Sequence, residues 1–202
     1  NEMLTGSDGS AQWNTPNNEA NLDYINKYAQ DFVNAVRSTG GKNKYRNLIV
    51  TTYAASPVEK NLQKLVIPTD PCGNQSHLAV EVHTYAPYDW VNTYNKHWTA
   101  ECTREITNMF AMLKKYIMDQ GYPVVIGEYG SNGKNEDTIN KNSTHEEKLE
   151  AGKQASDMTI LCKQYNAAAF YWMGIVDGND RKESSFKWSM EEVADAIVNA
   201  AK

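Results

Sequence analysis

Residues 100–130 read AECTREITNMFAMLKKYIMDQGYPVVIGEYG and contain a complete helix-to-strand unit. Apolar residues recur there at the three- and four-residue spacing of one helical face: Ile106, Phe110, Leu113 and Ile117. This spacing predicts an amphipathic helix over about 100–119, which Gly121 and Pro123 end. The apolar run from Pro123 to Tyr129 follows at once and predicts a strand.

The same alternation of helix and strand extends over the rest of the chain. Strand patterns occupy four segments: 47–54, 78–85, 123–129 and 168–172. Helical patterns occupy about 19–38, 57–65, 100–119, 144–165 and the segment after residue 189. One helix followed by four strand–helix units predicts an α/β fold in which crossover helices join the strands of a parallel sheet.

Capping-box patterns mark the starts of the last two helices. Ser143 with Glu146, or Thr144 with Glu147, fits the first of them, and Ser189 with Glu192 fits the last.

Composition restricts the class of protein. The 202 residues carry a formal net charge of −5, which argues against a nucleic-acid binder, because such proteins need a basic face. No stretch approaches the roughly 18 consecutive apolar residues of a membrane span. We expect one domain over 1–202, with no second domain. That length falls short of the ~250 residues of a closed eight-stranded α/β barrel.

The cysteines and the start of the chain carry less information. Cys72, Cys102 and Cys162 lie far apart without a CxxC motif, so zinc is not expected and at most one disulfide can form within the chain. The start, Asn1-Glu2-Met3-Leu4, lacks the pattern of a signal peptide. A mature secreted protein and an excised segment would both begin in this way.

Polar or aromatic side chains end every predicted strand, at the edge of a parallel sheet where ligands bind. Glu128 ends an otherwise apolar strand, where a carboxylate is costly unless it is used or paired. His83 and Tyr85 point to the same face of one strand and suit the orientation of an acid/base or a nucleophile. A strand-end ion pair for Glu128, a core histidine for His83 and a core position for Trp172 are the structural alternatives.

The sequence contains no serine nucleophile elbow, no glycine-rich phosphate loop and no HExxH motif. Two carboxylates with aromatic platforms are the equipment of glycoside hydrolysis, in which one carboxylic acid protonates the leaving oxygen. The other carboxylate attacks the anomeric carbon or activates water.

Several motifs resemble, in order and spacing, the catalytic landmarks of glycoside hydrolase family 5. They are Asn1-Glu2, His83-Thr84-Tyr85, Ile126-Gly127-Glu128-Tyr129-Gly130 and Tyr171-Trp172. Residues 32–41 with 47–50 are similar to the helix 4–strand 5 segment of its cellulase and xyloglucanase branch, subfamily 4. The resemblance covers essentially the whole chain.

The resemblance implies a role for each matching residue. Glu2 corresponds to the acid/base at the end of strand 4, and Glu128 to the nucleophile at the end of strand 7. Both steps of the implied retaining mechanism run on carboxylates, so no metal or cofactor is expected. The implied substrate-binding residues are Asn1, His83, Tyr85 and Trp172.

The implied fold is half of a (β/α)8 TIM barrel, with strands 5 to 8 and their helices preceded by helix 4. Two residues depart from the family pattern: Met3 replaces a usual proline, and Met173 replaces a commonly polar residue. The family also implies a cis peptide between Trp172 and Met173. Three tryptophans have either an outer subsite or a structural role: Trp13, Trp90 and Trp98.

We therefore expect a secreted, extracellular endo-β-1,4-glucanase that acts on a β-glucan polysaccharide or oligosaccharide. The alternatives are a glucan-binding barrel fragment without turnover, or a family 5 enzyme for xyloglucan, mixed-linkage glucan, mannan or xylan. We expect no nucleic-acid or membrane partner. The open strand edges at 47–54 and 168–172 predict either a missing N-terminal half or a homodimer that pairs these edges. The inward faces exposed in such a half barrel would be Leu48, Val50, Val80, Val82, Val125 and Phe170.

Overall fold

The computed structural model describes residues 2–3, 19–73, 75–92, 97–131, 143–172, 175 and 188–202. Asn1, Trp13 and Met173 lie outside the described residues, and the predicted cis peptide between Trp172 and Met173 lies outside them too.

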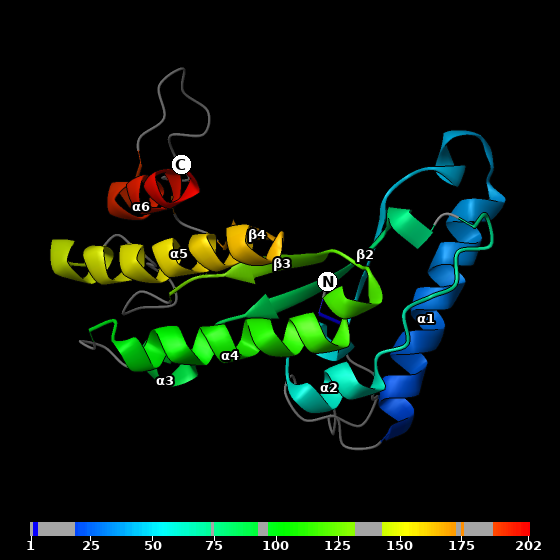
Figure 1. The fold of residues 1–202 in the computed structure, drawn as a ribbon, viewed down its shortest axis with the longest axis horizontal. Helices are drawn as coiled ribbons and strands as arrows, with labels where there is room; N and C mark the ends of the chain where they lie inside the picture. The colour runs from blue at the N-terminus through cyan, green and yellow to red at the C-terminus, as the bar shows by residue number, and fades with distance from the viewer. Residues whose placement is uncertain are drawn as a thin grey trace. The chain divides into compact units, whose positions relative to one another are not determined.

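A four-stranded sheet has the strand order β1-β2-β3-β4, and Figure 1 labels β2, β3 and β4. Its strands are β1 (Leu48–Thr51), β2 (Leu78–Thr84), β3 (Val124–Tyr129) and β4 (Ala168–Tyr171). β1 and β2 are parallel, with Leu48 paired to Leu78 and Val50 to Val80. All four strands lie within the segments that the sequence predicts, and β1 and β4 end the strand order as expected.

Six α-helices are described, and five of them match the predicted helices. Their bounds are α1 Glu19–Ser38, α2 Glu59–Lys64, α3 Tyr88–Asn92, α4 Ala100–Tyr116, α5 His145–Tyr165 and α6 Glu191–Ala201. Short 3₁₀ turns lie at Gly41–Lys44, Tyr53–Ala55, Gln75–His77 and Met118–Gln120. The sequence patterns do not predict α3, which is five residues long. None of the described helices is both long and apolar enough to cross a bilayer.

Helix capping confirms one prediction and corrects another. Thr144 caps α5 in a complete capping box with Glu147, which decides between the two boxes that the sequence leaves open. Ser189 does not cap α6, because that helix begins at Glu191 and its N-cap residue is Met190. The backbone N–H of Ser189 instead donates to the carbonyl of Ile175, 2.7 Å away.

The contacts divide the chain into two compact units. The first unit comprises Asn1–His83 with Ala111–Val125, and the second comprises Thr84–Phe110 with Ile126–Lys202. In the first unit, Leu22 and Ile25 of α1 pack with Tyr53 and Ala54 in a buried cluster. A buried ion pair joins Arg37 near the end of α1 to Asp70, with Nε 2.8 Å from Oδ2.

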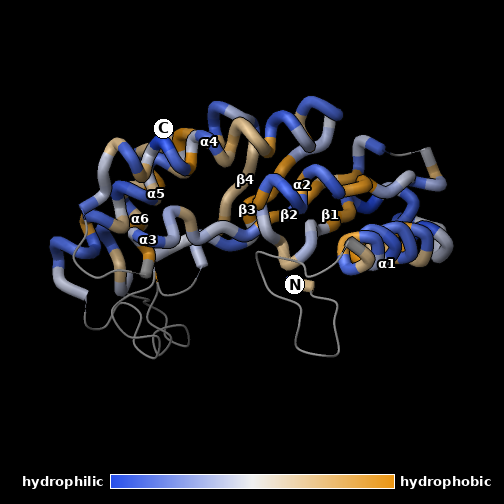
Figure 2. The backbone as a smooth tube through the Cα atoms, turned by 90° about the horizontal axis from the view of Figure 1, so that it is seen from below, coloured by the Kyte–Doolittle hydropathy of each residue, from blue (hydrophilic) through white to orange (hydrophobic). Residues whose placement is uncertain are grey.

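The strands of the first unit bury the side that was predicted to line the open barrel interior and face water. Leu48 and Val50 are 4% exposed and Val80 is fully buried, whereas Ile49 is 46% exposed. Successive side chains of a strand point to opposite faces, so the exposed face of β1 is that of Ile49. The predicted orientation of Leu48, Val50, Val80 and Val82 is therefore wrong. Figure 2 shows hydrophobic stretches in β1, β2 and β3, and strands that carry apolar residues on both faces do not reveal which face is covered.

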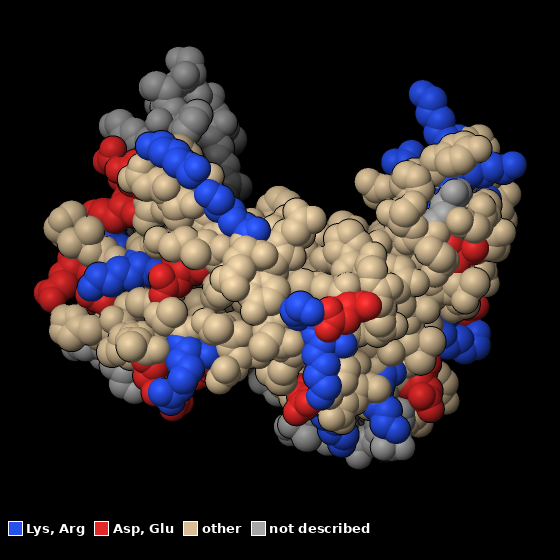
Figure 3. Space-filling view, viewed as in Figure 1, with Lys and Arg blue, Asp and Glu red and all other residues tan. Residues whose placement is uncertain are grey.

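In the second unit, α5 and α6 pack closely against each other. A Cβ atom at Gly152 of α5 would lie 3.0 Å from the carbonyl oxygen of Glu192 in α6, so glycine permits this approach. Phe170 of β4 is 60% exposed, as predicted. Basic and acidic side chains intermingle on the face shown in Figure 3, in keeping with the small net charge.

Candidate active site

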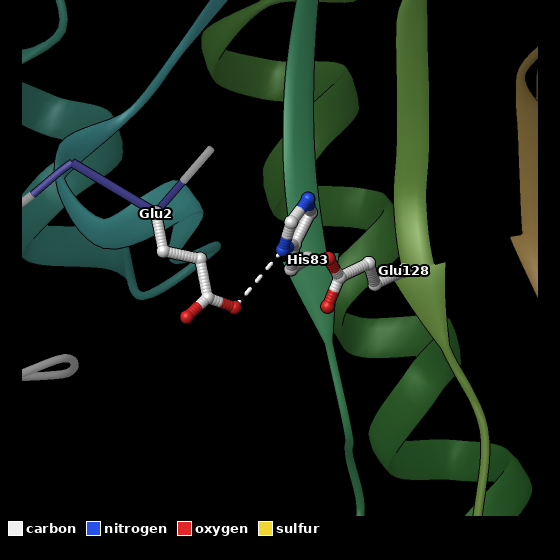
Figure 4. Close-up of side chains that lie close together, drawn as sticks. All are labelled: Glu2, His83 and Glu128. Atoms are coloured by element: carbon white, nitrogen blue, oxygen red, sulfur yellow. Dashed lines mark hydrogen bonds and ion pairs between the residues drawn. The ribbon is translucent and has the colours of Figure 1, made fainter. Parts of the chain in front are cut away.

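In the first unit, His83 lies between two carboxylates. Its Nδ1 is 2.9 Å from Oε1 of Glu2, and its Nε2 is 3.1 Å from Oε1 of Glu81. Figure 4 shows the Glu2 contact as a dashed line, with His83 projecting from β2. His83 is 5% exposed, so its ring is held in a largely buried position. Glu81 lies two residues before His83 on β2 and therefore projects to the same face.

These two contacts limit where protons can reside. A neutral imidazole donates from one nitrogen and accepts at the other, whereas an imidazolium donates from both. Three arrangements satisfy both contacts of His83. The ring can be charged between two carboxylates. Second, a neutral ring can donate from Nε2 to Glu81 and accept at Nδ1 from a protonated Glu2. Third, it can donate from Nδ1 to Glu2 and accept at Nε2 from a protonated Glu81. The second arrangement presents Glu2 as a carboxylic acid.

The backbone beside Glu2 is anchored to the turn after β1. The N–H of Ala54 donates to the carbonyl of Met3, 2.9 Å away. Ala54 and Ala55 both have left-handed backbones, with φ of 55° and 52°, and both are buried. A left-handed alanine costs roughly 1–2 kcal/mol, so this turn stores strain where it holds the segment with Glu2.

In the second unit, Glu128 receives a hydrogen bond from Tyr85. The Tyr85 hydroxyl donates to Oε2 of Glu128 over 2.9 Å, and Glu128 is 7% exposed near the end of β3. Figure 4 shows Glu128 extending from that strand. A nearly buried carboxylate that accepts from a hydroxyl group is held in a fixed position, which suits a carboxylate nucleophile.

The ends of β3 and β4 are fastened together beside Glu128. The N–H of Trp172 donates to the carbonyl of Tyr129 over 2.7 Å, and the rings of Tyr129 and Tyr171 meet edge to face at 5.2 Å. Burial raises the pKa of Tyr129 far above its usual range, so its phenol stays neutral. Trp172 is 45% exposed and so offers a ring surface on which a ligand can stack.

The structure brings together two pairs of the predicted site residues, Glu2 with His83 and Tyr85 with Glu128. Sequence reasoning missed Glu81, although its position two residues before His83 on a predicted strand was the available signal. Asn1 lies outside the described residues.

Trp90 and Trp98 have structural surroundings. Their rings meet edge to face at 5.0 Å in a cluster with Val91 and Cys102, and Trp90 is only 8% exposed. Nε1 of Trp98 donates to Oδ2 of Asp157 over 2.8 Å. These contacts favour the structural role that the sequence left open for both tryptophans.

Comparison with known proteins identifies the family. The model of the cellulase family, glycosyl hydrolase family 5, matches residues 1–177. The chain belongs to glycoside hydrolase family 5. The suspected family is thereby confirmed, and the four-stranded parallel sheet with its helices is half of the (β/α)8 barrel.

Individual relatives support the same assignment. Endoglucanase A of Ruminococcus albus is 29% identical over 96% of this chain and 52% of its own length. The crystal structure of a family 5 enzyme from Prevotella bryantii is 41% identical, with a TM-score of 0.87, and the match covers 96% of this chain and 54% of that one. A broad-specificity endoglucanase of subfamily 4 from Clostridium acetobutylicum is 26% identical, with a TM-score of 0.80 over 98% of this chain and 58% of its own. The chain thus spans about half the length of these relatives.

Proposed function

We propose that this chain is the catalytic half-barrel of a retaining endo-β-1,4-glucanase. The observation that carries the proposal is that the end of β2 provides partners for two carboxylates. His83 contacts Glu2, and Tyr85, two residues later, donates to Glu128. A retaining glycosidase requires one carboxylate as nucleophile and a second carboxyl group as acid and then base.

The first chemical step forms a covalent glycosyl-enzyme. An oxygen of Glu128 attacks the anomeric carbon while Glu2 gives its proton to the leaving glycosidic oxygen, so the bond to the leaving sugar breaks as the ester bond forms. Tyr85 holds Oε2 of Glu128 and so orients the attacking group. His83 contacts Oε1 of Glu2 through Nδ1 and so orients the carboxyl group of Glu2.

The second step releases the sugar. Glu2, now a carboxylate, takes a proton from water, which attacks the anomeric carbon and displaces Glu128. Two inversions give net retention, for which the two carboxyl groups must lie about 5–5.5 Å apart in the working enzyme. Asn1 and Trp172 complete the proposal as the partner of the sugar 2-hydroxyl and the stacking platform.

The proposed substrates are β-1,4-linked glucans, including cellulose-like, mixed-linkage and xyloglucan chains. Names of relatives support this class: one is a xyloglucan-specific endo-β-1,4-glucanase from Bacteroides ovatus, and one solved structure is an endo-β-mannanase/endo-β-glucanase from Prevotella bryantii. A family 5 structure from Prevotella bryantii holds a xyloglucan tetradecasaccharide. We propose an extracellular location, because such polymers do not enter cells.

The second candidate is a glucan-binding fragment without turnover. The observation that favours it is the 45% exposed Trp172, because an aromatic ring can stack on a sugar without any contribution from the two carboxylates. Hydrolysis of carboxymethyl cellulose by the purified 202-residue chain separates the two candidates. Parallel assays on barley β-glucan, xyloglucan, mannan and xylan then define the preferred backbone.

Azide rescue tests the two carboxylate roles. Glu128→Ala should lose nearly all activity, and added azide should yield the inverted glycosyl azide, because azide replaces the missing nucleophile on its face of the sugar. Glu2→Ala should keep activity on aryl glycosides with good leaving groups, and azide should yield the retained product. Glu101→Ala, at an exposed glutamate of α4, is the matched control and should behave as wild type. Azide products of the opposite configuration would reverse the assignment.

A further inference from the structure

Helix α5 directs one buried polar side chain toward the ends of two strands. Gln154 is fully buried, and two residues on the same face of α5, Ala151 and Met158, are apolar and buried beside it. Its Nε2 lies 3.2 Å from the carbonyl oxygen of Gly130 and 3.5 Å from that of Ala86. The two N–H bonds of a primary amide match two carbonyl acceptors, so one side chain can serve both.

The two carbonyls flank the hydrogen bond of the candidate nucleophile. Ala86 directly follows Tyr85, whose hydroxyl donates to Glu128. Gly130 is two residues after Glu128, and a Cβ atom there would meet the backbone of Trp172 at 3.3 Å. Gln154 therefore joins the backbone beside the donor to the backbone beside the acceptor. All of these residues belong to the second unit.

Packing alone does not account for a glutamine at this position. Burying an amide is costly unless it is hydrogen-bonded, and Oε1 of Gln154 has no hydrogen-bond partner among the described residues. A methionine of similar length would fill the same space without a buried unpaired oxygen. The amide is useful for what its N–H groups hold, the carbonyls of Ala86 and Gly130.

We propose that Gln154 is a positioning residue that sets the geometry of the hydrogen bond between Tyr85 and Glu128. It touches neither the sugar nor the reacting atoms, and it acts through the two backbone segments that carry them. The geometric part stands on the contacts above, whereas its effect on catalysis rests on the proposed function. Displacing a reacting group by about 1 Å can lower a rate by about 100-fold.

A double-mutant cycle tests this role. Gln154→Met should lower kcat on a soluble glucan by about 10- to 100-fold with KM within about twofold, because the nucleophile is misplaced while the substrate still binds. In a Tyr85→Phe background the same change should lower kcat less than about threefold, since the bond to be positioned is already lost. Leu161→Ala, which opens a cavity further along α5, controls for general destabilisation and should leave kcat within about twofold. Additive losses in the cycle would overturn the proposal.

A spectroscopic reading separates this proposal from the proposed function. With 3-fluorotyrosine at position 85, Glu128→Gln should move the ¹⁹F signal, Gln154→Met should also move it, and Leu161→Ala should not. A moved signal in a chain that hydrolyses nothing would retain the positioning role and reject the glucanase. An unmoved signal in a chain that hydrolyses glucan would reject the positioning role and retain the glucanase. If Gln154→Met does not fold, Gln154→Asn carries the same test, because it withdraws the amide from both carbonyls by one methylene.

Discussion

At the scale of single residues, the contact between Glu81 and His83 bears on the acid role of Glu2. When a neutral His83 donates from Nε2 to Glu81, its Nδ1 is left to accept from a protonated Glu2. Glu81→Leu should therefore lower kcat on glucans, whose leaving group needs a proton, and spare dinitrophenyl glycosides, whose leaving group does not. In metal sites, mutation of a partner that orients a histidine lowers metal affinity or activity by about 10- to 100-fold. For Glu81→Leu we expect kcat on glucans to fall by about tenfold. Glu81→Gln keeps an acceptor oxygen and should stay near wild type. Equal losses on both substrates would argue for a merely structural Glu81.

The site residues that the sequence predicts are those that stand out within a single strand. His83, Tyr85 and Glu128 are polar groups at the ends of apolar runs, and the structure gives each a partner from the predicted set. Glu81 and Gln154 were missed for different reasons. Glu81 is unremarkable until its contact with His83 is known. Gln154 is one polar residue on a helix face whose burial depends on tertiary packing, and only the structure shows the carbonyls that it serves.

At the scale of elements, periodicity predicted the type of each long helix and strand but not the orientation of the sheet. Parallel strands are apolar on both faces, so alternation cannot distinguish the helix-covered face from the barrel interior. Leu48 and Val50 are consequently buried where exposure was expected, and Ile49 is the exposed residue of β1. Ser189 was misplaced because α6 begins one residue later than a cap at that position requires.

A buried thiol on α5 should make the protein less stable at alkaline pH. Burial raises the pKa of the Cys162 thiol from 9.0 to about 12. The folded thiol keeps its proton at a pH where the unfolded thiol loses it, so this contribution is complete below about pH 9 and is lost as pH rises toward 12. Urea titrations should show the free energy of unfolding falling by at most ~1.4 kcal/mol per pH unit from this group. Cys162→Ala should flatten that fall, and profiles that run parallel in the two proteins would exclude the effect. Cys102→Ala is the control on α4.

At the scale of the whole molecule, the two end strands predict association. β1 and β4 each have one neighbour in the strand order, and each carries an exposed apolar residue, Ile49 at 46% and Phe170 at 60%. Parallel sheets are seldom left uncovered, because free edges and apolar faces favour pairing with another chain. We expect sedimentation at micromolar concentration to show a dimer, and Phe170→Lys to shift it toward monomer. Glu101→Lys on the exposed surface of α4 is the control and should leave the proportion of dimer unchanged. A cooperatively folding wild-type monomer would contradict this prediction.

The close approach of α5 and α6 at Gly152 has a consequence for how the sequence can vary. Every substitution of glycine adds at least a Cβ atom, which here meets a backbone carbonyl of α6 rather than a flexible side chain. Such a contact is tighter than most real Cβ contacts, so α6 has to shift slightly to accept even an alanine, and Ala196 lies close by as a second neighbour across the helix pair. In a randomised library, position 152 should therefore be enriched in glycine, with alanine next and larger side chains depleted. Residues of α6 that face away from α5 are free of this constraint and should vary more.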